Sequence, residues 1–123
     1  MNPKACVLGL AGLEPTAAEQ IFFAEAQPLG FILFARNIGA PTQVRELVGR
    51  LRACVGCADA PVLIDQEGGR VARLRPPHWH ELPAAARVAA LPHRTARDAA
   101  WLCGRLIAHD CAALGIDVVC APT

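Results

Sequence analysis

Strand-like and helix-like segments alternate along this chain, in the order βαβαβ, a loop, and then αβ. Four short apolar runs have the length and composition of strands, and they cover residues 5–11, 31–35, 62–64 and 116–121. Three longer segments separate them and carry apolar residues at helical spacing, at residues 17–27, about 42–56 and 94–114. Repeated strand-helix units predict right-handed crossovers and a parallel sheet with its helices outside.

The expected helices carry start and stop signals. Thr16 precedes the first helix and Glu19 follows it three residues later, which is the spacing of a capping box. Thr42 is the expected N-cap of the second helix, and Gly115 is the expected stop of the third. A long segment with several prolines, after Ile64 and up to the third helix, is expected to be a loop, and loops of that length are usually functional.

Four strand-helix units favour half of an eight-stranded barrel. An open doubly wound sheet is the competing architecture, but no G-x-G-x-x-G follows the first strand and no P-loop pattern occurs in the chain. At 123 residues the chain is too short for two ordinary domains. It also stops at a strand end with no helix after it. We therefore expect residues 1–123 to be the N-terminal part of a single α/β barrel domain in a longer protein.

The segment from Pro61 to Leu74 joins an apolar strand to two acids, two glycines and two arginines. The strand at 62–64 is expected to be buried on both faces, so that Asp65 emerges where it ends. A carboxylate there can accept hydrogen bonds from two neighbouring sugar hydroxyls, while the glycines let a backbone come close and an arginine adds a fork of donors. The alternative is a loop acid that only pairs locally with Arg70.

Charge and hydropathy exclude several classes of partner. The chain has 12 Lys plus Arg against 11 Asp plus Glu, a net charge of +1, and no basic run, so neither nucleic acid nor an anionic membrane is expected as a partner. The longest apolar runs have only strand length, and the N-terminal run lacks a signal-peptide cleavage site. A cytoplasmic location is the resulting expectation.

Six cysteines lie in apolar or helical contexts and not in a loop-rich disulfide framework, so reduced and mostly buried thiols are expected. Cys54 and Cys57 have the C-x-x-C spacing of redox pairs and of half a zinc site, which leaves a small thiol or metal-binding module as an alternative. His78 and His80 flank Trp79, and a surface loop with a packed tryptophan is favoured there because no third metal ligand is indicated. No metal and no cofactor are expected.

Three blocks of the sequence carry a family resemblance. They are Gly-Phe-Ile-Leu-Phe-Ala-Arg-Asn-Ile at 30–38, Ile-Asp-Gln-Glu-Gly-Gly-Arg-Val-Ala-Arg-Leu at 64–74 and Leu-Gly-Ile-Asp-Val-Val-Cys-Ala-Pro at 114–122. Together they resemble the bacterial β-N-acetylhexosaminidases of glycoside hydrolase family 3 over nearly the whole chain. The resemblance implies a TIM-like (β/α)8 barrel, of which this chain supplies about the first four strand units, and it implies that Asp65 and Arg73 hold the sugar in the terminal subsite.

The activity implied by the resemblance is removal of terminal, non-reducing N-acetylglucosamine from β-N-acetylhexosaminides, typically from cytoplasmic peptidoglycan fragments during cell-wall recycling. The expected partner is such a glycan or muropeptide. The Asp-Gln-Glu-Gly-Gly-Arg block favours this branch over the β-glucosidases of the same family, which are the close alternative.

Members of this family also carry a Lys-His-Phe-Pro-Gly-His-Gly segment, an acid/base histidine on a mobile loop and a nucleophilic aspartate, all further along the chain. None of these motifs occurs here, and His78, His80, His93 and His109 lie in no matching motif. Asp65 is therefore not expected to be a nucleophile, no catalytic residue is expected in this chain, and the chain by itself is expected to be inactive. A non-catalytic carbohydrate-binding or remnant domain is a further alternative.

Overall fold

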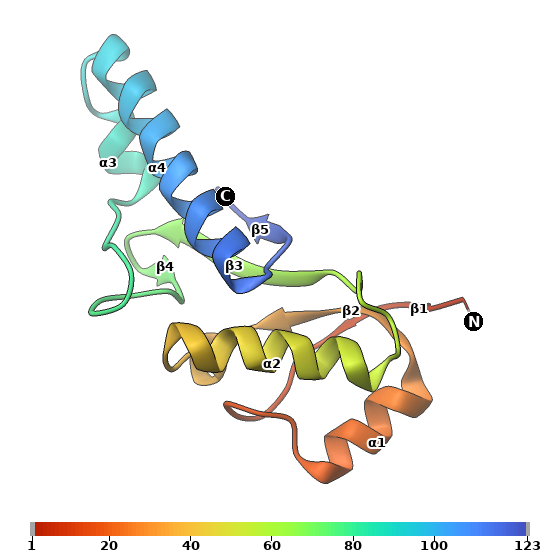
Figure 1. Ribbon diagram of the computed structural model, residues 1–123. Coiled ribbons are helices and arrows are strands. Elements are labelled where there is room, and N and C mark those ends of the chain that lie inside the picture. Colours follow the sequence, from red (N-terminus) through yellow and green to blue (C-terminus); the bar gives the residue numbers. More distant parts are fainter. Residues whose placement is uncertain (1, 123) are drawn as a thin grey trace.

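The fold is built on a parallel sheet whose strands are neighbours in chain order. The computed structural model describes residues 2–122. The parallel strands are β1 (Lys4–Leu8), β2 (Pro28–Leu33), β3 (Val62–Gly68) and β5 (Val118–Cys120), as Figure 1 shows. A short strand, β4 (Val71–Ala72), turns back and pairs antiparallel with the second half of β3. Parallel strands in sequence order are the arrangement of a (β/α)8 barrel.

Helices connect the strands. In the described residues the α-helices are α1 (Ala17–Ala26), α2 (Pro41–Cys54), α3 (Ala85–Ala89) and α4 (His93–Leu114). Three of them, α1, α2 and α4, follow one another along the same side of the sheet (Figure 1). The first half of α4 extends beyond the sheet together with α3. A 3-10 turn, η1 (Ala35–Asn37), follows β2. Across residues 2–122, no helix combines the length and the apolar character that crossing a bilayer requires.

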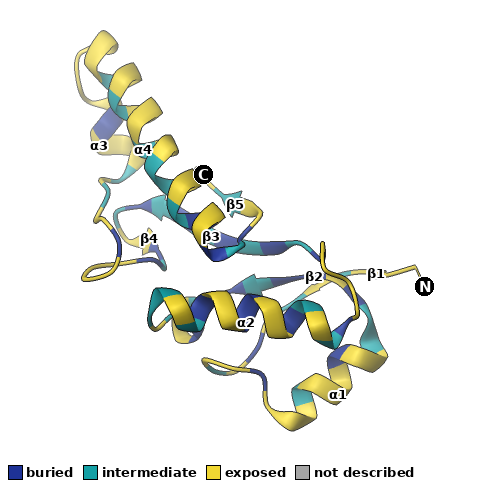
Figure 2. Ribbon diagram, viewed as in Figure 1, coloured by how far each residue is buried: buried dark blue, intermediate teal, exposed yellow. Residues whose placement is uncertain are grey.

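The hydrophobic core lies between the sheet and this helical layer, where Figure 2 shows the buried residues. Burying an aliphatic or phenyl side chain completely contributes about 1.5–3 kcal/mol, so this layer dominates the stability of the fold. Its fully buried members from the strands and helices are Phe23, Phe31, Leu33, Val44, Leu47, Leu51, Val62, Ile64, Cys111 and Leu114.

Only one face of the sheet is buried. Along β3 the side chains alternate, with Val62 and Ile64 buried and Leu63 half-buried. The strand register aligns Leu63 with Ile32 on one side and with Val118 on the other, and Val118 is 41% exposed. In a closed barrel this face would line the interior. The expectation that the strand at 62–64 is buried on both faces is therefore wrong for the described residues.

The helix ends follow the sequence signals with one exception. The capping box is confirmed, because the Glu19 amide donates to Thr16 Oγ1 (3.2 Å) and the Thr16 amide donates to Glu19 Oε2 (2.8 Å). Gly115 ends α4 in the left-handed region, at φ 78°. Thr42 is not the N-cap of α2, since Ala40 occupies that position and Pro41 begins the helix. Proline suits the first helical position because its φ is fixed and it lacks an N–H to satisfy.

The remaining corrections concern strand bounds and the long loop. The first strand ends at Leu8 and not at residue 11, and the second covers Pro28–Leu33 and not 31–35. The third strand continues to Gly68. The segment expected to be a long loop contains both β4 and α3. The second half of β3 becomes a strand because β4 folds back on it, which residues 62–64 alone do not indicate.

Candidate functional site

Asp65 lies at the carboxyl end of the parallel part of the sheet. The ladder between β3 and β5 reaches Asp65, which is aligned with Cys120, and beyond it β3 pairs with β4. Asp65 therefore lies within β3. The sequence had predicted that it lies just after the strand. In TIM-like barrels this edge of the sheet is where ligands bind.

Asp65 pairs with Arg73, which follows β4. Arg73 Nη2 donates to Asp65 Oδ2 at 2.9 Å, and the two side chains are 24% and 26% exposed, respectively. Arg70, the local partner considered as the alternative, is exposed on the turn and makes no ion pair within the described residues. The hairpin of β3 and β4 thus brings together the two residues to which the family resemblance assigns the sugar.

The pair leaves polar atoms that a ligand can use. The second carboxylate oxygen of Asp65 accepts no hydrogen bond in the described residues, and the Arg73 side chain is 24% exposed, although its unpaired Nε is buried out of reach of a ligand. A carboxylate oxygen accepts from hydroxyl groups, and a guanidinium donates to their oxygens. The arrangement is therefore suited to holding neighbouring hydroxyls of a sugar ring.

Gly68 ends β3 and Gly69 begins the tight turn to β4, with φ of 101° and 60°. A Cβ on Gly68 would meet the Pro83 carbonyl oxygen, and the Gly69 amide donates to Leu82 O at 2.8 Å. The sequence predicts that these glycines allow a close backbone approach, and the approaching backbone is that of residues 82–84. Arg75 holds the same turn by donating to Ala72 O (3.0 Å) and Arg70 O (2.9 Å).

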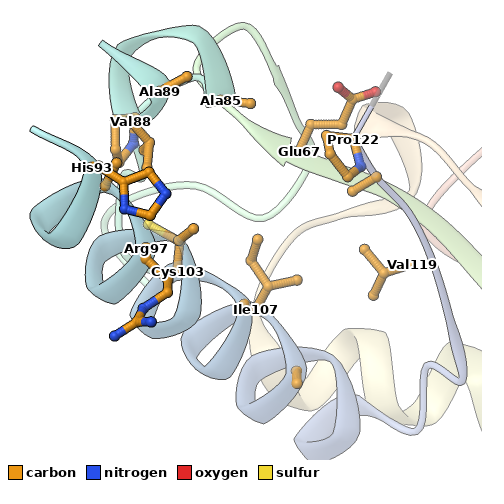
Figure 3. Close-up of a pocket in the computed structure, with 16 residues that line it drawn as sticks. Glu67, Ala85, Val88, Ala89, His93, Arg97, Cys103, Ile107, Val119 and Pro122 are labelled. Atoms are coloured by element: carbon orange, nitrogen blue, oxygen red, sulfur yellow. The ribbon is translucent and has the colours of Figure 1, made fainter. Parts of the chain in front are cut away.

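A large cavity lies apart from this pair. It measures about 640 Å³ and lies between α3, α4 and the carboxyl ends of β3 and β5 (Figure 3). Its walls are mostly apolar, with Val88, Ile107 and Val119 among them, and neither Asp65 nor Arg73 lines it. Glu67 lies at its rim beside Pro122. An apolar cavity with so few polar groups is suited to packing against apolar side chains and not to binding a polar sugar.

The histidines and Trp79 lie where the sequence predicts. His78, His80, His93 and His109 are exposed, while Trp79 is buried in the core cluster at 9% exposure. No group of three or more His, Cys, Asp or Glu side chains within residues 2–122 is arranged to hold a metal ion.

The cysteines are free, but they are less buried than the sequence predicts. Only Cys111 among the six is buried, and Cys57 is exposed. Burial, with a smaller effect of Asp110, raises the pKa of Cys111 to about 11, and burial also raises the pKa of the Cys54 thiol. Cys54 ends α2, and Cys57 lies in the turn after it.

We expect thiol titration of the denatured, non-reduced chain to find all six thiols. In the folded chain Cys57 should be alkylated fastest and Cys111 slowest, because a thiol of pKa near 11 is only about 0.1% thiolate at pH 8. The measurement is residue-resolved alkylation by mass spectrometry. A disulfide between Cys54 and Cys57, or stoichiometric zinc, in freshly prepared protein would instead support the thiol or metal-binding alternative.

Curated relatives of the chain are bacterial enzymes. The chain is 40% identical over 116 residues to the β-hexosaminidase of Pseudomonas aeruginosa, and the match covers 94% of the chain and 33% of that relative. It is 38% identical over 130 residues to the β-hexosaminidase of Xanthomonas oryzae pv. oryzae, covering 94% of the chain and 35% of that relative. The chain thus spans about a third of the length of the relatives it matches. No family model matches the chain.

Solved structures show the same relationship. NagZ from Neisseria gonorrhoeae, in complex with N-trifluoroacetyl-D-glucosamine, superposes with a TM-score of 0.87 at 27% identity, over 98% of this chain and 36% of that one. A glycoside hydrolase family 3 β-N-acetylglucosaminidase from Paenibacillus superposes with a TM-score of 0.81 at 29% identity, over 94% of this chain and 22% of that one. In sequence and in fold, this chain is thus similar to an N-terminal portion of the bacterial β-hexosaminidases and of glycoside hydrolase family 3 enzymes built on a TIM-like barrel.

Proposed function

We propose that this chain supplies the terminal-sugar subsite of a glycoside hydrolase that removes non-reducing N-acetylglucosamine from β-N-acetylhexosaminides. The observation that carries the proposal is the Asp65–Arg73 pair at the carboxyl edge of the parallel sheet, with one carboxylate oxygen left for a ligand. The curated relatives are named β-hexosaminidases, and a structural neighbour is in complex with an N-acylated glucosamine. These relatives support N-acetylglucosamine over glucose as the sugar.

The roles of the two residues follow from their chemistry. Asp65 would accept hydrogen bonds from two neighbouring hydroxyls, and Arg73 would keep the carboxylate in place while donating to a third sugar oxygen. A retaining glycosidase needs a nucleophile and a proton donor on opposite sides of the scissile bond. Asp65, which is engaged by an arginine, is suited to binding and not to attack. We infer that the catalytic groups come from the part of the barrel that this chain does not contain, and that the chain alone does not hydrolyse substrate.

Peptidoglycan fragments in the cytoplasm are the natural substrates that we propose for such an enzyme. They carry terminal N-acetylglucosamine, which is the sugar that the proposed subsite would hold. The aglycone would be a muropeptide.

A chimera tests the proposal. This chain would replace the matching third of the Pseudomonas aeruginosa β-hexosaminidase, and hydrolysis of a chromogenic N-acetyl-β-glucosaminide would be compared with that of the matching β-glucoside. We expect hydrolysis of the N-acetylated substrate, and none from the 123-residue chain or the remaining two thirds assayed alone.

Two outcomes would contradict the proposal. One is a chimera that melts cooperatively yet neither hydrolyses the N-acetylated substrate nor binds N-acetylglucosamine. The other is faster hydrolysis of the β-glucoside, which would favour the β-glucosidase alternative. Mixing the chain with the separately produced remainder of the relative provides a second route to the same measurement.

A further inference from the structure

Gln66 is a buried polar residue that the proposed site does not yet explain. It is 4% exposed and, with Asn37, is one of two buried polar or charged residues in the described part of the chain. It follows Asp65 directly in β3, and the alternation of the strand places it on the opposite face, in line with Val62 and Ile64. Hydrophobic side chains ordinarily fill such positions, and a buried amide there is costly unless each of its groups is hydrogen-bonded.

Both polar atoms of the Gln66 side-chain amide are hydrogen-bonded to residues that follow β4. Its Oε1 accepts from the amides of Arg73 (2.8 Å) and Leu74 (3.0 Å), and its Nε2 donates to Leu74 O (3.0 Å). In the ladder, Gln66 itself is aligned with Ala72. The side chain therefore takes over where the backbone pairing of β4 ends, and it fixes the main chain of the next two residues.

The Arg73 side chain is held by few polar contacts. The guanidinium makes one hydrogen bond within residues 2–122, to Asp65, and its buried Nε has no partner there. Because fixing a long side chain in one rotamer costs conformational entropy, the position of the guanidinium depends on where its backbone is held. Two adjacent residues of β3 hold Arg73 from opposite faces of the strand. The Asp65 carboxylate binds the Arg73 side chain, and the Gln66 side chain binds the Arg73 main-chain amide.

Leu74 explains why the anchor must be firm. It is 1% exposed and belongs to the core cluster, so its amide and carbonyl groups are removed from water. The Gln66 side chain satisfies both groups. The chain can therefore enter the core at Leu74 immediately after presenting Arg73 on the open face.

We propose that Gln66 is a positioning residue for the sugar subsite: its side-chain amide fixes the backbone of Arg73 and Leu74 and thereby sets the Arg73 guanidinium beside Asp65. This inference rests on the proposed function. It adds a residue that does not touch the sugar and acts through Arg73.

Two substitutions separate positioning from general stability. Gln66→Met keeps the length of the side chain and removes all three hydrogen bonds, whereas Gln66→Glu keeps oxygen acceptors for the Arg73 and Leu74 amides. Both variants should lower Tm, the first through unpaired groups and the second through a buried carboxyl. Sugar affinity should fall about tenfold in Gln66→Met, which corresponds to about 1.4 kcal/mol, and less than threefold, or about 0.6 kcal/mol, in Gln66→Glu.

Arg52→Met is the matched control for lost stability. Arg52 donates to Ala60 O (3.1 Å), Gly115 O (3.0 Å) and Asp117 Oδ2 (2.8 Å), at the other end of β3 from the site. The same Asp117 oxygen accepts from the Val62 amide (2.9 Å). This variant should melt earlier than the wild type and bind the sugar as the wild type does.

The measurements are amide hydrogen exchange of Arg73 and Leu74 in the 123-residue chain and the affinity for N-acetylglucosamine, in the chain and in the chimera. Exchange at these amides should accelerate in Gln66→Met more than in Gln66→Glu. Affinity that follows Tm across all three variants, including Arg52→Met, would show that Gln66 is only structural. Equal affinity of wild type and Gln66→Met would overturn the positioning role alone, whereas no binding by the wild type in either setting would overturn the proposed function and this inference with it.

Discussion

Asp65→Asn should weaken the binding of N-acetylglucosamine by roughly one to two orders of magnitude. The substitution preserves size but replaces a charged acceptor with an amide, and hydrogen bonds to charged groups contribute about 1.5–3 kcal/mol. At about 1.4 kcal/mol per factor of ten, that loss gives the stated range. It also leaves Arg73, three-quarters buried, without the carboxylate that lies 2.9 Å from its Nη2. The measurement is the inhibition constant of N-acetylglucosamine for the wild-type and Asp65→Asn chimeras. The Tm of each chimera is measured alongside.

Arg73→Ala should act on the same step. Because Asp65 and Arg73 would hold one sugar ring and each other, the double variant should lose less affinity than the two single variants combined. The competing view is that the pair only stabilises the hairpin of β3 and β4. In that case the variants would melt earlier while their affinity stayed unchanged, so normal inhibitor binding by a well-folded Asp65→Asn protein would refute the sugar-site assignment.

The fold was accessible from the sequence because its main signals are local. Apolar runs of strand length, the capping box of Thr16 and Glu19, and the left-handed stop at Gly115 each involve residues close together in the chain. The order of strands and helices then allowed few topologies. Strand ends were less accessible, since β3 extends to Gly68 only because β4 returns to pair with it.

The site was accessible in part. The type and spacing of Asp65 and Arg73, read with the family resemblance, identified the pair that the structure brings together. The spacing did not distinguish Arg73 from Arg70 as the partner, because that choice depends on how the hairpin turns. Gln66 was missed, although a polar residue in register with the buried Ile64 is a signal that alternation could have revealed.

Contacts between distant segments account for most of what the sequence did not show. The Pro83 carbonyl lies where a Cβ on Gly68 would be, which a pair of adjacent glycines cannot indicate. The apolar cavity beside α4 depends on how α3, α4 and β5 are placed, and its lining residues are spread from Glu67 to Pro122. Such contacts are set by the tertiary fold and leave no periodic trace in the chain.

Gly68→Ala should be among the most destabilising single methyl additions in this chain. At φ 101° an L residue is strained, which costs about 1–3 kcal/mol, and the new Cβ would also press on the Pro83 carbonyl oxygen. Overpacking of this kind typically costs a further 1–3 kcal/mol or so. Each kcal/mol lowers Tm by about 4–8 °C in a domain of 60–100 residues and by about 2–4 °C in one of 150–250, so a drop of at least roughly 6 °C is expected here by calorimetry or circular dichroism.

Gly49→Ala is the control, because it makes the same chemical change with the opposite expected sign. Gly49 lies inside α2, and a Cβ there would meet nothing within 4 Å. Alanine is favoured over glycine in a helix interior by about 0.5–1 kcal/mol, so this variant should melt a few degrees later than the wild type. A Gly68→Ala chain that melts with the wild type would mean that residues 82–84 do not close over the turn. The loop would then be free to move, and the glycines would be available for the close approach of a ligand that the sequence first indicated.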